Sequence, residues 1–203
     1  VDGPVDWDDL NAGYNTTQFF SIGISSAAGD TRVAGGTQDN GTPFIRLDDL
    51  SGRSRDISSG DGGYVYFGEE YAFVTFSQGS MLRLNYNREN DPTFAGFSLI
   101  HPLNAVDPLF AHPFAVDPND ENVIYYPASQ AMWRIQDVSA IRNGNTDDGI
   151  TDGWEVVSGL PNVGPRIISA LSVSRQPAHI LYYGASDLGD ENPLPPTLYR
   201  LDE

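Results

Sequence analysis

Gln38, Asp39, Asn40 and Asp61 are the side chains whose chemistry and placement most favour a ligand-binding site in this sequence. Amides and carboxylates recognise ligands by hydrogen bonding, and two carboxylates about 5 to 10 Å apart can hydrolyse a glycosidic bond. Asp39 and Asp61 are the pair that we nominate for that reaction. The alternative interpretation is a turn, because Asp and Asn before Gly bond backbone N–H groups and Gly accepts positive φ.

A second candidate is the loop of residues 143–152, where oxygen-bearing side chains alternate along the chain. The candidate ligands of a hard cation are Asn143, Asn145, Asp147 and Asp152. Calcium needs several oxygens that converge on one point. The match to the EF-hand pattern is imperfect because Gly falls one place late. Calcium is the one cofactor that the sequence suggests, and a solvated hairpin loop is the alternative.

Several other kinds of chemistry lack their residues. The chain has no Cys, which excludes thiol catalysis, disulfides and cysteine-ligated metals. Its three histidines show no metal spacing, and no Ser-His-Asp arrangement, phosphate loop or dinucleotide fingerprint is recognisable. The 203 residues carry a formal net charge of -17, and all 11 basic residues are Arg. We therefore expect no nucleic-acid partner, because binding to phosphate needs a basic stripe.

The composition predicts a single all-β domain. Hydrophobic residues make up 39% of the chain, beside 21 Gly and 14 Pro, which is too apolar for disorder and too rich in turn formers for a helical bundle. No apolar run approaches the roughly 20 residues that span a bilayer, so we expect no membrane insertion.

A fourfold repeat sets the expected architecture. An apolar-Arg-apolar triplet recurs, with its arginine at positions 46, 83, 134 and 200. A β-rich run ending in a small polar turn precedes each triplet, and the equivalent turn residues are Asp39, Gln78, Gln130 and Asp187. Their spacings of 39, 52 and 57 residues are typical of β-propeller blades, with insertions in the later copies.

The repeats contain short apolar runs that we interpret as antiparallel strands A to D, and in the second repeat the D strand is expected from Gly96 to Ile100. The expected blades are residues 17–59, 62–101, 111–159 and 167–203, and the last stops after its third strand. Residues 3–10 have the pattern of an outer strand. This strand either closes a small ring, or the chain is a segment of a larger propeller. We favour the segment, because the commoner rings have more than four blades.

This architecture places the candidate residues. In antiparallel blades the B–C turns and D–A connections lie on one face, so the turn of Gln38 to Asn40 and Asp61 should share a face near the propeller mouth. The repeated arginine should lie at one height in every blade, where it can bridge to the neighbouring blade.

Part of the chain resembles a known family. Residues 10–20, the segment Gly35 to Thr42 and the segment Gly60 to Gly63 resemble the Asp-box (BNR) repeat proteins related to Vps10/sortilin propellers and, more distantly, to xyloglucanase-type glycoside hydrolases. A complete Asp-box is missing, and residues 145–149 leading to Trp154 are the nearest match. The cysteine-rich modules that accompany the Vps10 propeller are also missing, so a sorting-receptor role does not transfer.

These observations favour a non-catalytic binding module, secreted or at the cell surface, that recognises a protein or glycan partner through its loop face. Further blades of the same polypeptide are another expected partner. The alternatives are a glycoside hydrolase of the BNR-repeat type and a structural component of a cell-surface assembly.

Overall fold

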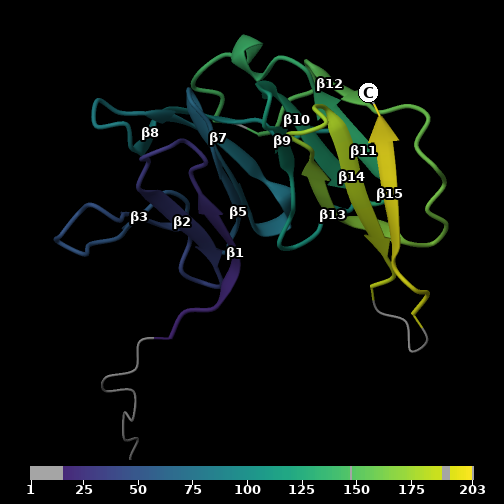
Figure 1. Cartoon of the computed structure of the whole chain (residues 1–203), viewed down its shortest axis with the longest axis horizontal. Helices are drawn as coiled ribbons and strands as arrows, with labels where there is room; N and C mark the ends of the chain where they lie inside the picture. Colours follow the sequence, from purple (N-terminus) through teal and green to yellow (C-terminus); the bar gives the residue numbers. More distant parts are fainter. Residues whose placement is uncertain (1–15, 147, 189–192, 203) are drawn as a thin grey trace, which may run out of the picture.

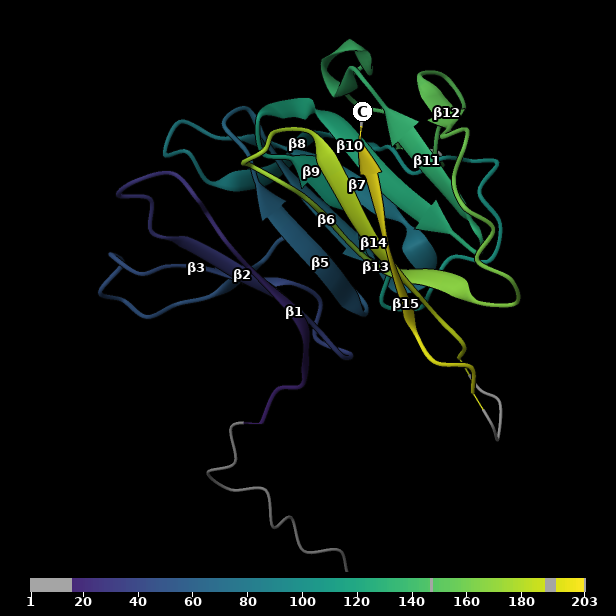
Figure 2. The ribbon, with the colours of Figure 1, turned by 45° about the vertical axis from the view of Figure 1, so that its right-hand side comes forward.

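The computed structural model describes residues 16–146, 148–188 and 193–202, which form four antiparallel sheets arranged as the blades of a β-propeller (Figures 1 and 2). Strands pair with their neighbours in sequence, in the orders β1-β2-β3-β4, β5-β6-β7-β8, β12-β11-β10-β9 and β13-β14-β15. The fourth sheet has three strands in the described part of the chain, as the repeat predicts. Residues 3–10, the expected outer strand, lie outside the described residues.

The strands of the four blades have the following bounds. Blade 1 contains β1 (Phe19–Ile24), β2 (Arg32–Thr37), β3 (Pro43–Arg46) and β4 (Arg55–Asp56). Blade 2 contains β5 (Gly62–Phe67), β6 (Tyr71–Phe76), β7 (Met81–Tyr86) and β8 (Pro92–Leu99). Blade 3 contains β9 (Ala115–Asp117), β10 (Asp120–Ala128), β11 (Ala131–Ile135) and β12 (Trp154–Val156). Blade 4 contains β13 (Ile167–Val173), β14 (Ile180–Ser186) and β15 (Thr197–Asp202). Two short 3-10 turns follow β6 and β11, namely η1 (Ser77–Gly79) and η2 (Val138–Ala140).

One outer strand differs from the sequence expectation. The apolar run predicts a D strand of blade 2 from Gly96 to Ile100, whereas β8 begins at Pro92. The register of β8 on β7 shifts between Arg83 and Asn85, and Gly96 has φ of 70°. Glycine tolerates this irregularity, so the strand continues through a residue that breaks the sequence pattern.

The core consists of three apolar clusters, each between consecutive blades. Strand β6 explains the arrangement, because its successive side chains point to opposite faces of the sheet. Ala72 and Val74 pack toward blade 1 with Phe44, while Phe73 packs toward blade 3 with Tyr126. Blade 2 is therefore covered on both faces, and its strands are apolar without the alternation typical of a half-exposed sheet.

Blades 1 and 2 approach each other closely through glycines of the segments Gly35 to Thr42 and Gly60 to Gly63. A Cβ on Gly36 would lie 1.9 Å from the carbonyl oxygen of Gly63, and a Cβ on Gly62 would lie 2.2 Å from that of Gly41. Side chains do not fit at these backbone contacts. The closeness brings the B–C turn of blade 1 against the start of blade 2.

Two of the four repeated arginines bridge blades as expected. Arg46 donates to the Glu89 carbonyl (3.0 Å) and to Asp91 (3.1 Å) in blade 2. Arg83, which is 1% exposed, donates to the Val138 and Ile141 carbonyls in blade 3 and stacks over Tyr71. Arg134 and Arg200 instead pair with Glu155 and Asp202 in their own blades.

Candidate functional site

The B–C turn of blade 1 has the backbone conformation that its sequence favours. Asp39 and Gly41 have φ of 62° and 64°, and the Thr37 amide and hydroxyl both donate to the Gly41 carbonyl at 2.9 Å. The Asn40 amide donates to the Gln38 carbonyl at 3.0 Å. Asn and Asp accept the left-handed region more readily than most residues, so this turn follows from local chemistry.

Asp61 lies directly beside this turn. Its Oδ1 accepts the backbone N–H of Asp39 at 2.9 Å, and the Gly41 N–H donates to the Gly60 carbonyl at 2.6 Å. Gly41 and Asp61 also form a parallel bridge. The structure thus brings together Asp39 and Asp61, and one carboxylate oxygen of Asp61 orients the turn. The proposed role of these residues in binding a ligand stays a prediction.

A polar hollow of about 540 Å³ opens next to the turn. Asp39 and Asn40 line it, whereas Gln38 and Asp61 do not. The remaining lining comes from the segment before β1, from the end of the turn with the start of β3, and from β4 and its flanks. These residues are Thr16, Thr17, Gly41, Pro43, Ser54, Asp56, Ser58, Ser59 and Gly60. Sequence reasoning missed Asp56, although its strand position opposite Pro43 places it on this side of the blade.

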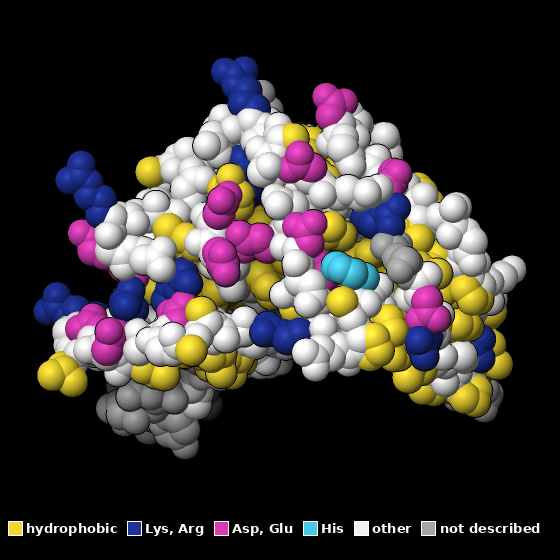
Figure 3. Space-filling model, turned by 45° about the horizontal axis from the view of Figure 1, so that its top comes forward, with side chains coloured by type: hydrophobic (Ala, Val, Ile, Leu, Met, Phe, Trp, Pro, Cys, Tyr) yellow, Lys and Arg dark blue, Asp and Glu magenta, His cyan; other side chains and the backbone are white. Residues whose placement is uncertain are grey.

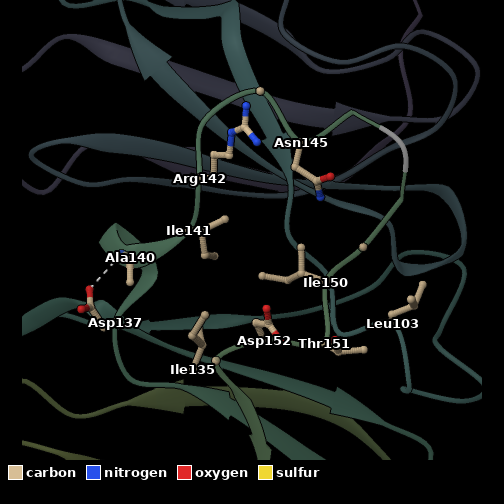
Figure 4. A pocket seen from close by; sticks show the side chains of 13 residues that line it. Leu103, Ile135, Asp137, Ala140, Ile141, Arg142, Asn145, Ile150, Thr151 and Asp152 are labelled. Carbon is tan, nitrogen blue, oxygen red and sulfur yellow. Dashed lines mark hydrogen bonds between the residues drawn. The ribbon is translucent and has the colours of Figure 1, made fainter.

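The sequence-predicted calcium loop lines part of a different cavity, of about 650 Å³, which is formed mainly by the connection from β11 to β12 (Figure 4). Asn143 Oδ1 accepts a bond from the Arg83 guanidinium at 2.6 Å, so a cation already contacts that oxygen. The Asn145 amide donates to the Leu99 and Asp148 carbonyls, each at 2.8 Å. Asn145 and Asp152 lie on either side of Ile150 (Figure 4). Asp147 lies outside the described residues, and calcium binding stays a prediction.

The three histidines are dispersed over the fold. His112 is 1% exposed, accepts the Leu109 N–H and packs on the Tyr126 ring at 4.1 Å; burial lowers the pKa of His112 to about 3. His101 lies 3.2 Å from Asp148, and burial lowers the pKa of His101. His179 Nδ1 lies 2.6 Å from the buried Asp117. Among the described residues, no three His, Cys, Asp or Glu side chains group as a metal site.

Comparisons with known proteins leave the family open. No protein-family model matches the chain, and no curated protein matches its sequence. The structure shows the propeller blades that the Asp-box resemblance implies, while membership of that family stays a hypothesis. In the part of the chain that the structure describes, neither 3-10 turn has the length or apolarity to cross a membrane.

Proposed function

We propose that this chain is a non-catalytic, extracytoplasmic binding module that recognises a glycan in the polar hollow of blade 1. The observation that carries the proposal is the lining of that hollow, where exposed Asp39 and Asn40 face hydroxyls and the carboxylate of Asp56. Carboxylates, amides and hydroxyls are the groups that bind sugar hydroxyls by hydrogen bonding, and a turn fixed by its own backbone bonds holds them in place at little entropic cost.

The test is a glycan array probed with the purified chain, followed by titration of the best glycan into two variants. Asp39→Asn removes one charge from the hollow and keeps a residue suited to positive φ. We expect a roughly tenfold loss of affinity, because a hydrogen bond to a charged group contributes about 1.5 to 3 kcal/mol. Asp107→Asn is the control, since Asp107 is also exposed with φ of 52° but lies outside the hollow.

Equal losses of affinity in Asp39→Asn and Asp107→Asn would show that the glycan proposal is wrong. A chain that binds no glycan on the array but captures a protein partner would show the same. Release of reducing sugar by the wild-type chain, lost in Asp61→Asn, would instead support the glycoside hydrolase alternative. That reaction would require the second oxygen of Asp61, because its Oδ1 is bonded to the turn.

A structural role in a larger propeller is the second candidate. The apolar side chains of Ile22, Ile24 and Leu198 are 60%, 67% and 74% exposed on the strands of blades 1 and 4. Monomeric proteins rarely leave such sheet faces uncovered, and a further blade of the same polypeptide would cover them. An intact mass of the native protein far above 22.1 kDa would support this role, and a native mass equal to that value would contradict it.

A further inference from the structure

A further hollow lies on the face opposite the candidate glycan site, and all four blades contribute to it. It has a volume of about 880 Å³ and is lined by the A–B turns. These contributions are residues 25–30 of blade 1, Gly68 and Glu69 of blade 2, Pro118 and Asn119 of blade 3, and Arg175 of blade 4. Asp and Glu side chains gather around the middle of this face (Figure 3).

The acidic groups of the hollow outnumber the cations that remain to balance them. Arg32 forms a two-pronged pair with Asp30, holding the pKa of that carboxyl well below its usual range, and Arg46 pairs with Asp48 and Asp91. The carboxylates of Glu69, Asp120 and Glu121 then face one further cation, Arg175. Arg175 bonds Ser26 at 3.4 Å and has no ion-pair partner in the described ranges.

The architecture holds this charge in place. Both oxygens of Glu121 are fixed, one by the Glu69 N–H at 2.5 Å and the other by the Glu70 N–H at 3.0 Å. Gly68 permits the approach, because a Cβ there would lie 2.0 Å from Glu121 Oε2. The side chain of Glu69, in contrast, is exposed and forms no hydrogen bond or ion pair with the residues that the structure describes. Burial raises the pKa of the neighbouring Tyr66, and the charge of Glu121 adds to that rise.

The inner end of the hollow is apolar. Tyr66 and Pro118 line both the hollow and a smaller cavity of about 250 Å³ that lies among β5, β9 and β13, so they lie where the two meet. Lysine and arginine side chains combine an aliphatic stem with a cationic head, and they bury the stem against apolar surface while the head stays in a polar environment. In this hollow the apolar surface of Tyr66 and Pro118 suits the aliphatic stem, and the acidic side chains suit the cationic head.

We propose that this hollow binds a basic segment of a protein partner, with a lysine or arginine stem against Tyr66 and Pro118 and its cationic head among Glu69, Asp120 and Glu121. The site is independent of the proposed glycan site, which is formed by B–C and D–A segments on the opposite face. Electrostatic attraction to this face also speeds encounter with a basic partner.

The experiment measures binding of a fluorescent peptide of alternating lysine and glycine by fluorescence anisotropy, at low and at raised salt. The decisive variants are Glu69→Gln and Glu70→Gln, which remove the same charge from adjacent exposed residues, of which only Glu69 lines the hollow. We expect Glu69→Gln to weaken binding about three- to tenfold, Glu70→Gln to weaken it less than twofold, and raised salt to weaken binding to all three proteins.

Equal losses in the two variants would show that the peptide responds only to the net charge of the whole chain, and would overturn the proposal. Absence of binding at low salt would overturn it as well. A peptide with diaminopropionate in place of lysine tests the stem, because it keeps the cation and shortens the aliphatic part. Unchanged affinity for that peptide, or equally tight binding of free spermidine, would contradict recognition of a basic protein segment.

Discussion

One arginine position recurs in four blades, and burial decides what it does in each. Arg83 is enclosed between blades 2 and 3 and supplies donors to two carbonyls and to Asn143. Arg200 lies at the same position of the triplet in blade 4, but it is 55% exposed and pairs with Asp202 in its own strand. The same residue type thus stabilises an interface in one blade and a surface in another.

This contrast gives a matched prediction. Arg83→Lys should lower the free energy of unfolding by about 2 to 4 kcal/mol, because an ammonium cannot reproduce the planar set of donors in a buried site. Arg200→Lys should change it by less than about 0.5 kcal/mol, since exposed ion pairs contribute little. Urea unfolding of both variants provides the measurement. Similar losses would contradict the inter-blade role of Arg83.

The buried His112 predicts a dependence of stability on pH. Its pKa lies near 3 in the folded chain and near 6.5 in the unfolded chain, so between these values the unfolded chain binds more protons. The contribution of His112 is therefore complete above pH 6.5 and declines as the pH falls. Between pH 6.5 and 4.5 the decline should reach about 2 to 3 kcal/mol, at about 1.4 kcal/mol per pH unit.

Unfolding by urea at several pH values measures this effect in wild type and in His112→Asn, whose amide oxygen can still accept the Leu109 N–H. Asparagine does not titrate, so the variant should lose less stability on acidification, whatever its stability at pH 7. Parallel pH profiles of the two proteins would rule out His112 as the source.

At the scale of the element, two strands show that the need for glycine at equivalent positions depends on the neighbouring atoms. Gly36 and Gly184 both lie in B strands, β2 and β14. A Cβ at Gly36 would collide with the backbone of Gly62 and Gly63, whereas at Gly184 it would meet the Ala170 Cβ at an ordinary 3.8 Å. Close approach of two blades, rather than the strand itself, requires the first glycine.

Gly36→Ala should therefore destabilise the chain by more than about 3 kcal/mol or prevent folding, because the contact is with backbone that cannot rotate away. Gly184→Ala should change stability by less than about 1 kcal/mol. Thermal unfolding followed by circular dichroism compares the two, and soluble yield serves where Gly36→Ala does not fold. Tolerance of Gly36→Ala would disprove the tight packing of blades 1 and 2.

At the scale of the whole molecule, the dominant quantity is the net charge of -17, which makes the folded chain repel itself. Mobile ions screen that repulsion over about 10 Å at 0.1 M salt. Raising sodium chloride from 0.02 to 0.5 M should therefore increase the melting temperature by a few degrees. Salt also weakens the attractive ion pairs at the surface, but these contribute little to stability. A melting temperature that falls with salt would mean that attractive pairs outweigh the repulsion.

Sequence reasoning reached the repeat, the blade architecture and the position of the polar turn. It succeeded there because strand length, turn residues and the Asp39 to Gly41 conformation are decided locally. It missed the start of β8, since Pro92 and Gly96 are typical of breaks until a partner strand accommodates the bulge. It also missed Asp56, the bonds from the Glu69 and Glu70 N–H groups to Glu121, and the hollow of the four A–B turns. These features depend on which segments meet in the folded chain.

The amino-acid sequence by itself determined the elements: short antiparallel strands at a blade-like period, with acidic turns and a repeated arginine. Only the tertiary structure decided which arginine is buried, that the Asn143 oxygen faces a guanidinium, and which carboxylates share a hollow. The physical reason is the distance along the chain over which each kind of interaction acts. Backbone preferences act over a few residues, whereas burial and electrostatic neighbourhood arise between blades that lie 40 or more residues apart in sequence.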